Sequence, residues 1–214
     1  MRRAVSNQVV VKMNRSRVLS VAALVLCAVI AAWGQNEPYF PEGVFSDDSQ
    51  HDLFAANWYS KHLKALAEPS LPQLSKNPVL ESYRFIWLRT FHHPVIVRVD
   101  VRAGDAGELT SKVASGKGGY NSGHLVENTS RPLTRKQTET FLGRIKRVRF
   151  WELPSYENSG TGGEDGAQWI IEGVKDGKYH VVDRRSPVEG AVHDLGLTFA
   201  LGLAEMKIAR GELY

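Results

Sequence analysis

The stretch AQWIIEGVKDGKYHVVD, residues 167–183, decides the fold. Two alternating runs flank the pair Asp176-Gly177, which is typical of a type I′ hairpin turn because both central residues of that turn need positive φ. With these two residues as the loop, Lys175 faces Lys178, and the side-chain period of two fixes both faces of the hairpin. The face predicted to hold most of the polar groups comprises Ile170, Glu172, Val174, Tyr179, Val181 and Asp183.

Further strands are expected before this hairpin. A period of two begins at Tyr83 and returns at 95–101, where four valines share one side of the chain. Pro94 cannot donate to a sheet ladder, so it marks the start of that second strand. A third strand is expected near 109–113, after a glycine-containing turn, and a short fourth strand near 124–127.

Three helices are also expected. The first spans about 50–67 and is ended by Pro69. The second begins at Thr134, where Gln137 three residues later completes a capping box. The third spans about 192–208 and is apolar around most of its circumference, so it should be the most deeply buried.

These elements predict an α+β fold. We expect an antiparallel sheet of five or six strands, with two helices packed on one face and a peripheral N-terminal helix. The expected division of the chain is a signal peptide or N-terminal membrane anchor at 1–34, a segment at 35–78, and the α+β domain at 79–214. The middle segment combines a tether, an amphipathic helix and a proline-rich linker.

The N-terminal segment is typical of an exported protein. The first 34 residues carry five basic residues and no acidic one, and contain an apolar run at 18–33 and the small-x-small sequence Ala32-Trp33-Gly34. Translation could start at Met1 or at Met13. Because a membrane span needs about 17–25 apolar residues, an uncleaved inner-membrane anchor is the alternative to cleavage. In both cases the basic flank places the rest of the chain outside the cytoplasm, in the periplasm or secreted.

Export changes the charge balance and the cysteine content. The whole chain has 27 basic and 23 acidic residues, but without the five basic residues of the leader it has 22 and 23, a formal net charge of −1. Nucleic acid is therefore not an expected partner. The only cysteine, Cys27, lies in the apolar run, so the exported part has no thiol for a disulfide, for catalysis or for a metal. The membrane is expected to be contacted only through the N-terminal segment.

Two blocks of sequence carry a resemblance. They are YRFIWLRTFHHP, residues 83–94, and DGAQW, residues 165–169, which continues to YHVVD at 179–183. Through these blocks, over about residues 83–208, the chain resembles a family of uncharacterised bacterial exported proteins. The resemblance implies export. It brings no known activity that could be carried over to this chain.

Residue motifs likewise point away from a known enzyme class. The strings G-x-S-x-G, S-x-x-K and H-E-x-x-H and the P-loop pattern are all absent, and no cofactor is expected. Tyr120 lies in the glycine-rich loop 116–123, where an exposed aromatic ring suggests a binding role. We therefore expect a non-catalytic cell-envelope module that binds an envelope protein or a small ligand through its sheet edge and glycine-rich loops. The candidate binding residues are His92, His93, Lys117, Tyr120, His124 and Tyr179.

The histidines do not predict a metal site. Neighbouring residues on an extended segment point to opposite sides, so His92 and His93 cannot easily chelate one ion together. Either could pair with His124 or His180 from another strand. Zinc and copper sites usually have three or more protein ligands, and no third ligand is fixed here.

The alternative function is a small extracytoplasmic hydrolase that uses Glu172 or Asp183 together with His180. Two carboxyl groups in unequal environments can divide the roles of acid and base, and an enzyme of this kind needs a concave pocket where the groups converge. The competing interpretation is that each carboxylate pairs with an arginine beside the core. The arginines available for such pairing are Arg84, Arg98 and Arg184.

Overall fold

The computed structural model describes residues 39–102, 104, 106–157 and 165–214. The predicted signal peptide or anchor at 1–34 lies outside these residues. The described residues form one compact unit, which includes residues 39–78 of the segment 35–78 that the sequence assigned to a tether, a helix and a linker. Within the described part of the chain, no helix has the length and apolarity needed to cross a membrane.

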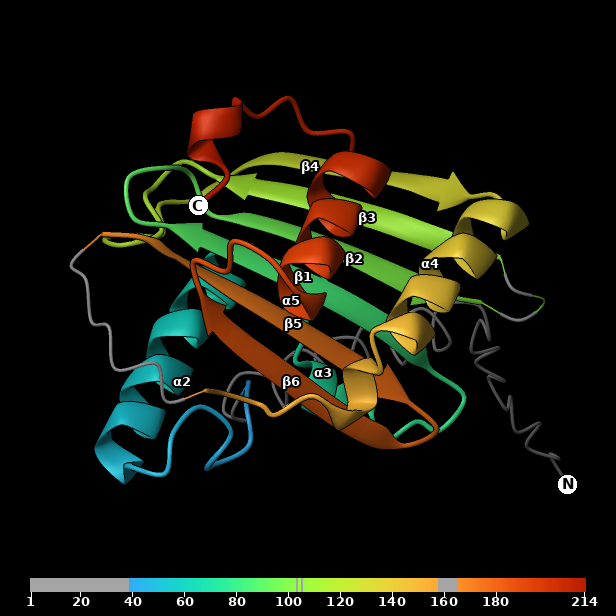
Figure 1. Ribbon diagram of the computed structural model, residues 1–214, viewed down its shortest axis with the longest axis horizontal. Helices are drawn as coiled ribbons and strands as arrows, with labels where there is room; N and C mark the ends of the chain where they lie inside the picture. Colours follow the sequence, from blue (N-terminus) through green and yellow to red (C-terminus); the bar gives the residue numbers. More distant parts are fainter. Residues whose placement is uncertain (1–38, 103, 105, 158–164) are drawn as a thin grey trace, which may run out of the picture. The chain divides into compact units, whose positions relative to one another are not determined.

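A six-stranded sheet is the centre of this unit (Figure 1). Its order is β4-β3-β2-β1-β5-β6, and all neighbouring strands are antiparallel, so the predicted α+β class with an antiparallel sheet is confirmed. The fourth strand is longer than the expected short segment. The strands are β1 Glu81–Arg89, β2 Val95–Val101, β3 Gly107–Ala114, β4 Leu125–Leu133, β5 Ala167–Lys175 and β6 Lys178–Arg185.

The hairpin β5–β6 has the register that its turn predicted. Lys175 pairs with Lys178, and both turn residues have positive φ, 51° at Asp176 and 74° at Gly177. The type I′ preference for an Asp-Gly pair explains this geometry. The register sets the side chains of Glu172, Tyr179 and Asp183 on one face, as the period of two requires.

Four α-helices flank the sheet, and a π-helix continues the last of them. Thr134 caps α4 with the predicted capping box, since its side chain accepts from the Gln137 amide and the Gln137 side chain accepts from the Thr134 amide. The described α-helices are α2 Ser49–Ala65, α3 Leu71–Leu74, α4 Arg135–Arg147 and α5 Ala191–Leu197.

The expectation of one continuous helix at 192–208 is wrong. After α5 the backbone forms a π-helix, Thr198–Leu203, and the Ala204 amide donates to the Phe199 carbonyl five residues earlier. The Thr198 hydroxyl donates to the Asp194 carbonyl at 2.7 Å, and the Thr198 amide donates to the same carbonyl. The wider π-turn changes the direction of the chain close to the sheet.

One face of the sheet is covered by α4, α5 and the π-helix (Figure 1). The core there consists largely of aromatic rings, with ring centroids 5.0 Å apart for Trp87 and Trp169 and 5.0 Å apart for Phe141 and Phe199. Both indole N–H groups donate to the main-chain oxygen of Tyr214, each at 3.2 Å. Buried tryptophans thus have the polar partner that their N–H groups need.

The other face of the sheet is packed against α2. The sequence predicted a peripheral N-terminal helix, whereas Leu63 and Leu66 have no exposed surface and pack with Ile86 and Ile170 of the sheet. Phe40, which was assigned to a tether, is buried in the same cluster. The cause is the apolar stripe of the helix, which is stable only when covered, and the second sheet face covers it.

Close packing of α5 on the sheet gives the first testable prediction. A Cβ atom at Gly196 would lie 2.3 Å from ring carbons of Trp169. Gly196→Ala should therefore lower the free energy of unfolding by about 1–3 kcal/mol, because an overpacked core must shift. Urea unfolding measures this change.

Gly143→Ala in α4 is the matched control. Nothing lies within 4 Å of its added Cβ, and glycine in an exposed helix costs about 1 kcal/mol relative to alanine. This variant should be as stable as the parent or more stable. Equal effects of the two alanines would contradict the close approach of α5.

Candidate ligand-binding site

A buried ion network fixes the C-terminal end of α2 on the sheet. The Arg84 side chain has no exposed surface, and its Nε donates to Oε2 of Glu172 at 2.7 Å. Its Nη1 donates to the Pro69 carbonyl at 2.7 Å and to Oε2 of Glu68 at 3.3 Å. Tyr179 donates its hydroxyl to the other oxygen of Glu172 at 2.9 Å. Glu172 is therefore paired with an arginine, as the competing interpretation required, and is not a free acid or base.

Glu68 is the second carboxylate of the network. It contacts three cations: Arg84, Arg98 at 3.0 Å and Lys112 at 2.8 Å. Burial alone would raise the pKa of Glu68, but these cations together hold it below its ordinary value. The Lys112 ammonium also donates to the carbonyls of Leu66 and Ala67 at the end of α2. The network therefore joins strands β1, β2, β3 and β5 to this helix end.

Asp183 lies on the same face but has a different partner. Tyr59 of α2 donates its hydroxyl to Oδ2 of Asp183 at 2.7 Å, and the side-chain amide of Gln168 donates to the Tyr59 oxygen at 3.1 Å. Burial is the main cause that raises the pKa of Asp183, to about 6. No arginine hydrogen bond to its carboxylate is among the described contacts of this group.

The hydrolase residues do not converge. His180 is one residue out of phase with Tyr179 and Val181, so it lies on the opposite face of the sheet from Glu172 and Asp183. There it packs against Phe150, with ring centroids 5.1 Å apart, and burial lowers its pKa. Neither carboxylate can therefore exchange a proton with His180 in this arrangement.

The other predicted histidines also have separate environments. Nδ1 of His92 is 2.9 Å from the Tyr214 hydroxyl, and Nδ1 of His93 is 2.8 Å from the Gly116 carbonyl. His124 contacts the Ser115 hydroxyl. Within the described ranges, no group of three or more His, Cys, Asp or Glu side chains is placed to hold a metal ion.

The glycine-rich loop 116–123 lies directly on the end of β1. The Gly118 amide donates to the His92 carbonyl at 2.9 Å, and the Gly119 amide donates to the Thr90 carbonyl at 3.1 Å. A Cβ atom at Gly118 would lie 2.6 Å from the Arg89 carbonyl oxygen. Glycine is needed there because the two backbones approach too closely for a side chain.

An open groove of about 470 Å³ lies between this loop and α2. Its walls come from α2, the end of β1, the glycine-rich loop and the start of β5. Two of the lining aromatic side chains are more than half exposed, Phe54 at 66 % and Tyr120 at 57 %. Tyr59 and Gln168 supply polar groups at its base.

The rings of α2 and the loop are connected at the rim of the groove. Phe54 and Trp58 are stacked, with centroids 6.1 Å apart and planes 16° apart. The Lys61 ammonium lies 3.8 Å from the centre of the Trp58 ring and donates to the Tyr120 carbonyl at 2.8 Å. Phe91, which does not line the groove, contacts the Tyr120 ring with 6.2 Å between centroids. We call Phe54, Trp58 and Tyr120, which line the groove, the aromatic rim.

Of the six residues that the sequence proposed for binding, only Tyr120 lines this groove. Lys117 is exposed in the same loop, and Tyr179 belongs to the ion network instead. Phe54 and Trp58, which also line the groove, were not proposed from the sequence. Their spacing of four residues is helical, but it is out of phase with the buried pair Tyr59 and Leu63, and that offset is the signal that they belong to another side of the helix.

The chain matches no family model, no curated protein and no solved structure.

The ion network gives the second prediction. Glu172→Gln removes a buried charge that Arg84 contacts and should lower the free energy of unfolding by about 3–5 kcal/mol, since breaking a buried pair leaves the partner charge uncompensated. Glu139→Gln, which alters the exposed pair with Arg135, is the control and should cost about 0.5 kcal/mol or less. Urea unfolding measures both variants. Similar decreases in the free energy of unfolding would contradict the larger contribution of the buried pair.

Asp183 gives a prediction for pH. Its pKa is about 6 in the folded protein against an ordinary 3.8, so between these values the folded protein holds a proton that the unfolded chain releases. Asp183 should therefore reduce the free energy of unfolding as pH rises from 3.8 to about 6, and its effect should be constant above that range.

Asp183→Asn tests this dependence because the amide can still accept from Tyr59 but cannot titrate. The difference in unfolding free energy, parent minus variant, should fall by about 1–2 kcal/mol across that window. Urea unfolding at several pH values measures it, and Asp176→Asn, in the exposed turn, controls for the loss of one negative charge. A difference that stays constant or rises with pH would contradict the raised pKa of Asp183.

Proposed function

We propose that this chain is a non-catalytic, exported module of the cell envelope that binds a ligand in the groove between α2 and the glycine-rich loop 116–123. The observation that carries this proposal is the aromatic rim, which gathers Phe54 and Trp58 of α2 and Tyr120 of the loop at one cavity, although the two segments are far apart in the sequence. Exposed apolar groups that are gathered in one patch commonly mark a binding surface.

The ligand chemistry follows from the lining of the groove. Aromatic rings form its rim, and the Gln168 side-chain oxygen, which has no hydrogen-bond partner among the described residues, supplies a polar group within it. Small-molecule sites combine an apolar lining with a few such polar groups in this way. A sugar ring has flat C–H faces that can stack on aromatic rings and hydroxyls that can bond to the base. We therefore take an oligosaccharide as the ligand class.

The placement in the envelope rests on the N-terminal segment. The basic residues and apolar run in the first 34 residues support export to the periplasm or beyond, with retention as an inner-membrane anchor as the alternative. The resemblance of residues 83–94 and 165–183 to bacterial exported proteins agrees with this location. Contact with the membrane is proposed only through the N-terminal segment, and nucleic acid is not proposed as a partner.

The hydrolase is not retained as a second candidate. Glu172 is paired with Arg84, and Asp183 and His180 lie on opposite faces of the sheet. An acid–base mechanism needs both groups within reach of one substrate atom.

Tyr120→Ala tests the proposal. The full-length protein is titrated with hexasaccharides of glucose, N-acetylglucosamine and galacturonate, and tryptophan fluorescence follows binding because Trp58 lines the groove. At least one saccharide should bind saturably. Tyr120→Ala should weaken that binding by about tenfold, since one well-placed aromatic contact contributes more than 1 kcal/mol. The melting temperature should not change, because the Tyr120 ring is largely exposed.

Val126→Ala is the control, as it shortens an exposed apolar side chain on β4 outside the groove. It should bind like the parent. Absence of saturable binding to all three saccharides, or a large loss of melting temperature in Tyr120→Ala, would contradict the proposal.

A further inference from the structure

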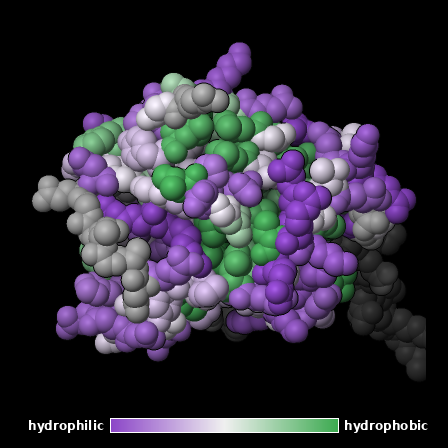
Figure 2. Space-filling view, viewed as in Figure 1, coloured by the Kyte–Doolittle hydropathy of each residue, from purple (hydrophilic) through white to green (hydrophobic). Residues whose placement is uncertain are grey.

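A second cavity lies on the opposite face of the sheet, between α4 and the segment formed by α5 and the π-helix. Its volume is about 610 Å³, within the roughly 300–1,000 Å³ of small-molecule sites. Phe141, Leu197 and Leu203 supply its apolar lining. Figure 2 shows hydrophobic residues gathered between α5 and α4, with hydrophilic residues of α4 beside them.

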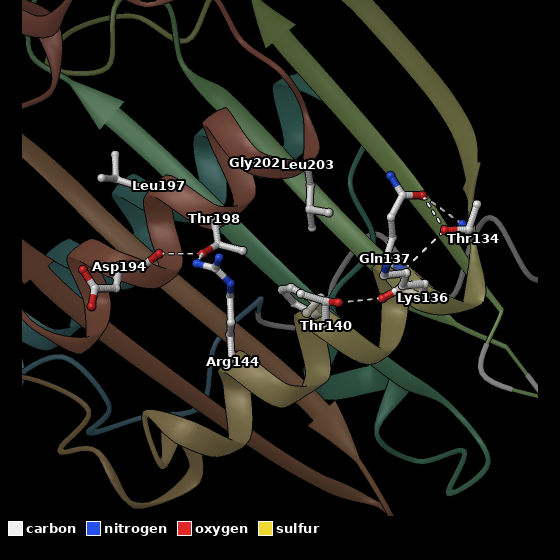
Figure 3. A pocket seen from close by; sticks show the side chains of 11 residues that line it. Thr134, Lys136, Gln137, Thr140, Arg144, Asp194, Leu197, Thr198, Gly202 and Leu203 are labelled. Atoms are coloured by element: carbon white, nitrogen blue, oxygen red, sulfur yellow. Dashed lines mark hydrogen bonds between the residues drawn. The ribbon is translucent and has the colours of Figure 1, made fainter.

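Two cationic side chains of α4 line this cavity. Lys136 and Arg144 both line it, and neither has an acidic partner in the part of the chain that the structure describes. Arg144 donates from Nη1 to the Thr198 hydroxyl at 3.0 Å, and that hydroxyl donates in turn to the Asp194 carbonyl (Figure 3). The guanidinium is thus held in place while most of its five N–H donors remain without a described protein acceptor.

The acidic group of the lining does not neutralise these cations. The Asp194 side chain is 69 % exposed, and its carboxylate lies 3.5 Å from Nδ1 of His193. Figure 3 shows this carboxylate turned away from the Arg144 guanidinium. The cavity therefore has an apolar floor and a cationic side, which is the complement of a molecule with an apolar chain and an anionic head.

The π-helix contributes the opposite wall. Thr198, Gly202 and Leu203 of this segment line the cavity, and Gly202 is exposed there without a side chain. Single π-turns within helices are frequent at functional sites because they displace the following residues from the regular helical positions. Here the displacement follows Thr198, the residue that holds Arg144.

We propose that this cavity binds a single-chain anionic amphiphile. The alkyl chain lies along Phe141, Leu197 and Leu203, and the carboxylate or phosphate head bonds to Arg144. Lys136, about 12 Å away along the helix, adds to the positive charge beside the cavity. An arginine suits either head group, because its fork of N–H donors matches two oxygens of a carboxylate or a phosphate. This site is independent of the saccharide groove, which lies on the α2 side of the sheet.

The test is calorimetric titration of the full-length protein with laurate and with dodecyl phosphate, both below their micellar concentrations. Each should bind saturably at one site. The double variant Lys136→Gln/Arg144→Gln should weaken binding by about tenfold or more, since hydrogen bonds to charged groups are stronger than those between neutral groups. Lys146→Gln/Arg147→Gln removes the same charge from the same helix outside the cavity, and should bind within about twofold of the parent.

A second variant keeps all charges and fills the space. The nearest atom to a Cβ added at Gly202 is the Leu197 carbonyl oxygen at 3.9 Å, so a side chain can begin there without a clash, and Gly202→Phe should place its ring in the cavity. It should abolish binding with an unchanged melting temperature. Gly202→Phe therefore tests whether the cavity is the binding site even when loss of Arg144 perturbs folding.

Three results would overturn the proposal. The first is the absence of saturable binding to both amphiphiles. The second is an equal loss in the two charge variants, which would indicate general attraction to the basic helix. The third is capture of the protein by phosphatidylglycerol vesicles without any binding of the monomeric amphiphiles, which would assign this face to a membrane surface.

Discussion

The buried Arg84 guanidinium is the interaction on which the arrangement of the two layers depends. It lies on the central strand β1 and joins Glu172 of β5 to Glu68 and the Pro69 carbonyl after α2. A buried charge is costly unless every partner is in place, so the helix end has one position relative to the sheet that satisfies it. The same position sets Tyr59 over Asp183 and holds α2 beside the glycine-rich loop, and the groove exists only because both walls are fixed.

The sheet separates two chemically different faces. On the α4 side the core is aromatic and its polar groups lie at the margins, as with the two indoles that bond to the Tyr214 main-chain oxygen. On the α2 side an apolar cluster adjoins the ion network. Because strands alternate their side chains, one sequence builds both faces at once. The groove beside α2 and the cavity between α4 and α5 thus share no lining residue and can be altered separately.

Local signals in the sequence predicted local structure well. The Asp176-Gly177 turn predicted the register of β5–β6, and Thr134 with Gln137 predicted the start of α4. The position of α2 could not be read in this way, because an apolar stripe requires a covering surface but does not identify it. The partners of Arg84 are separated from it by 16 and 88 residues, and no spacing rule connects such distant charges. The apolar spacing at 192–208 predicts a continuous helix and does not reveal the π-helix, and the groove depends on the pairing of two segments that only the fold places together.

The strand order also governs when the fold can be completed. Strand β1 is buried along almost its whole length and lies between β2, which follows it directly, and β5, whose Val174 pairs with Ser82 across 92 positions of sequence. As the chain is synthesised from its N-terminus, the meander β1–β4 can form early, yet one edge of the largely buried strand β1 stays open until the final hairpin arrives. An open apolar edge invites pairing with other chains. A chaperone that covers this edge would have its greatest effect in that interval.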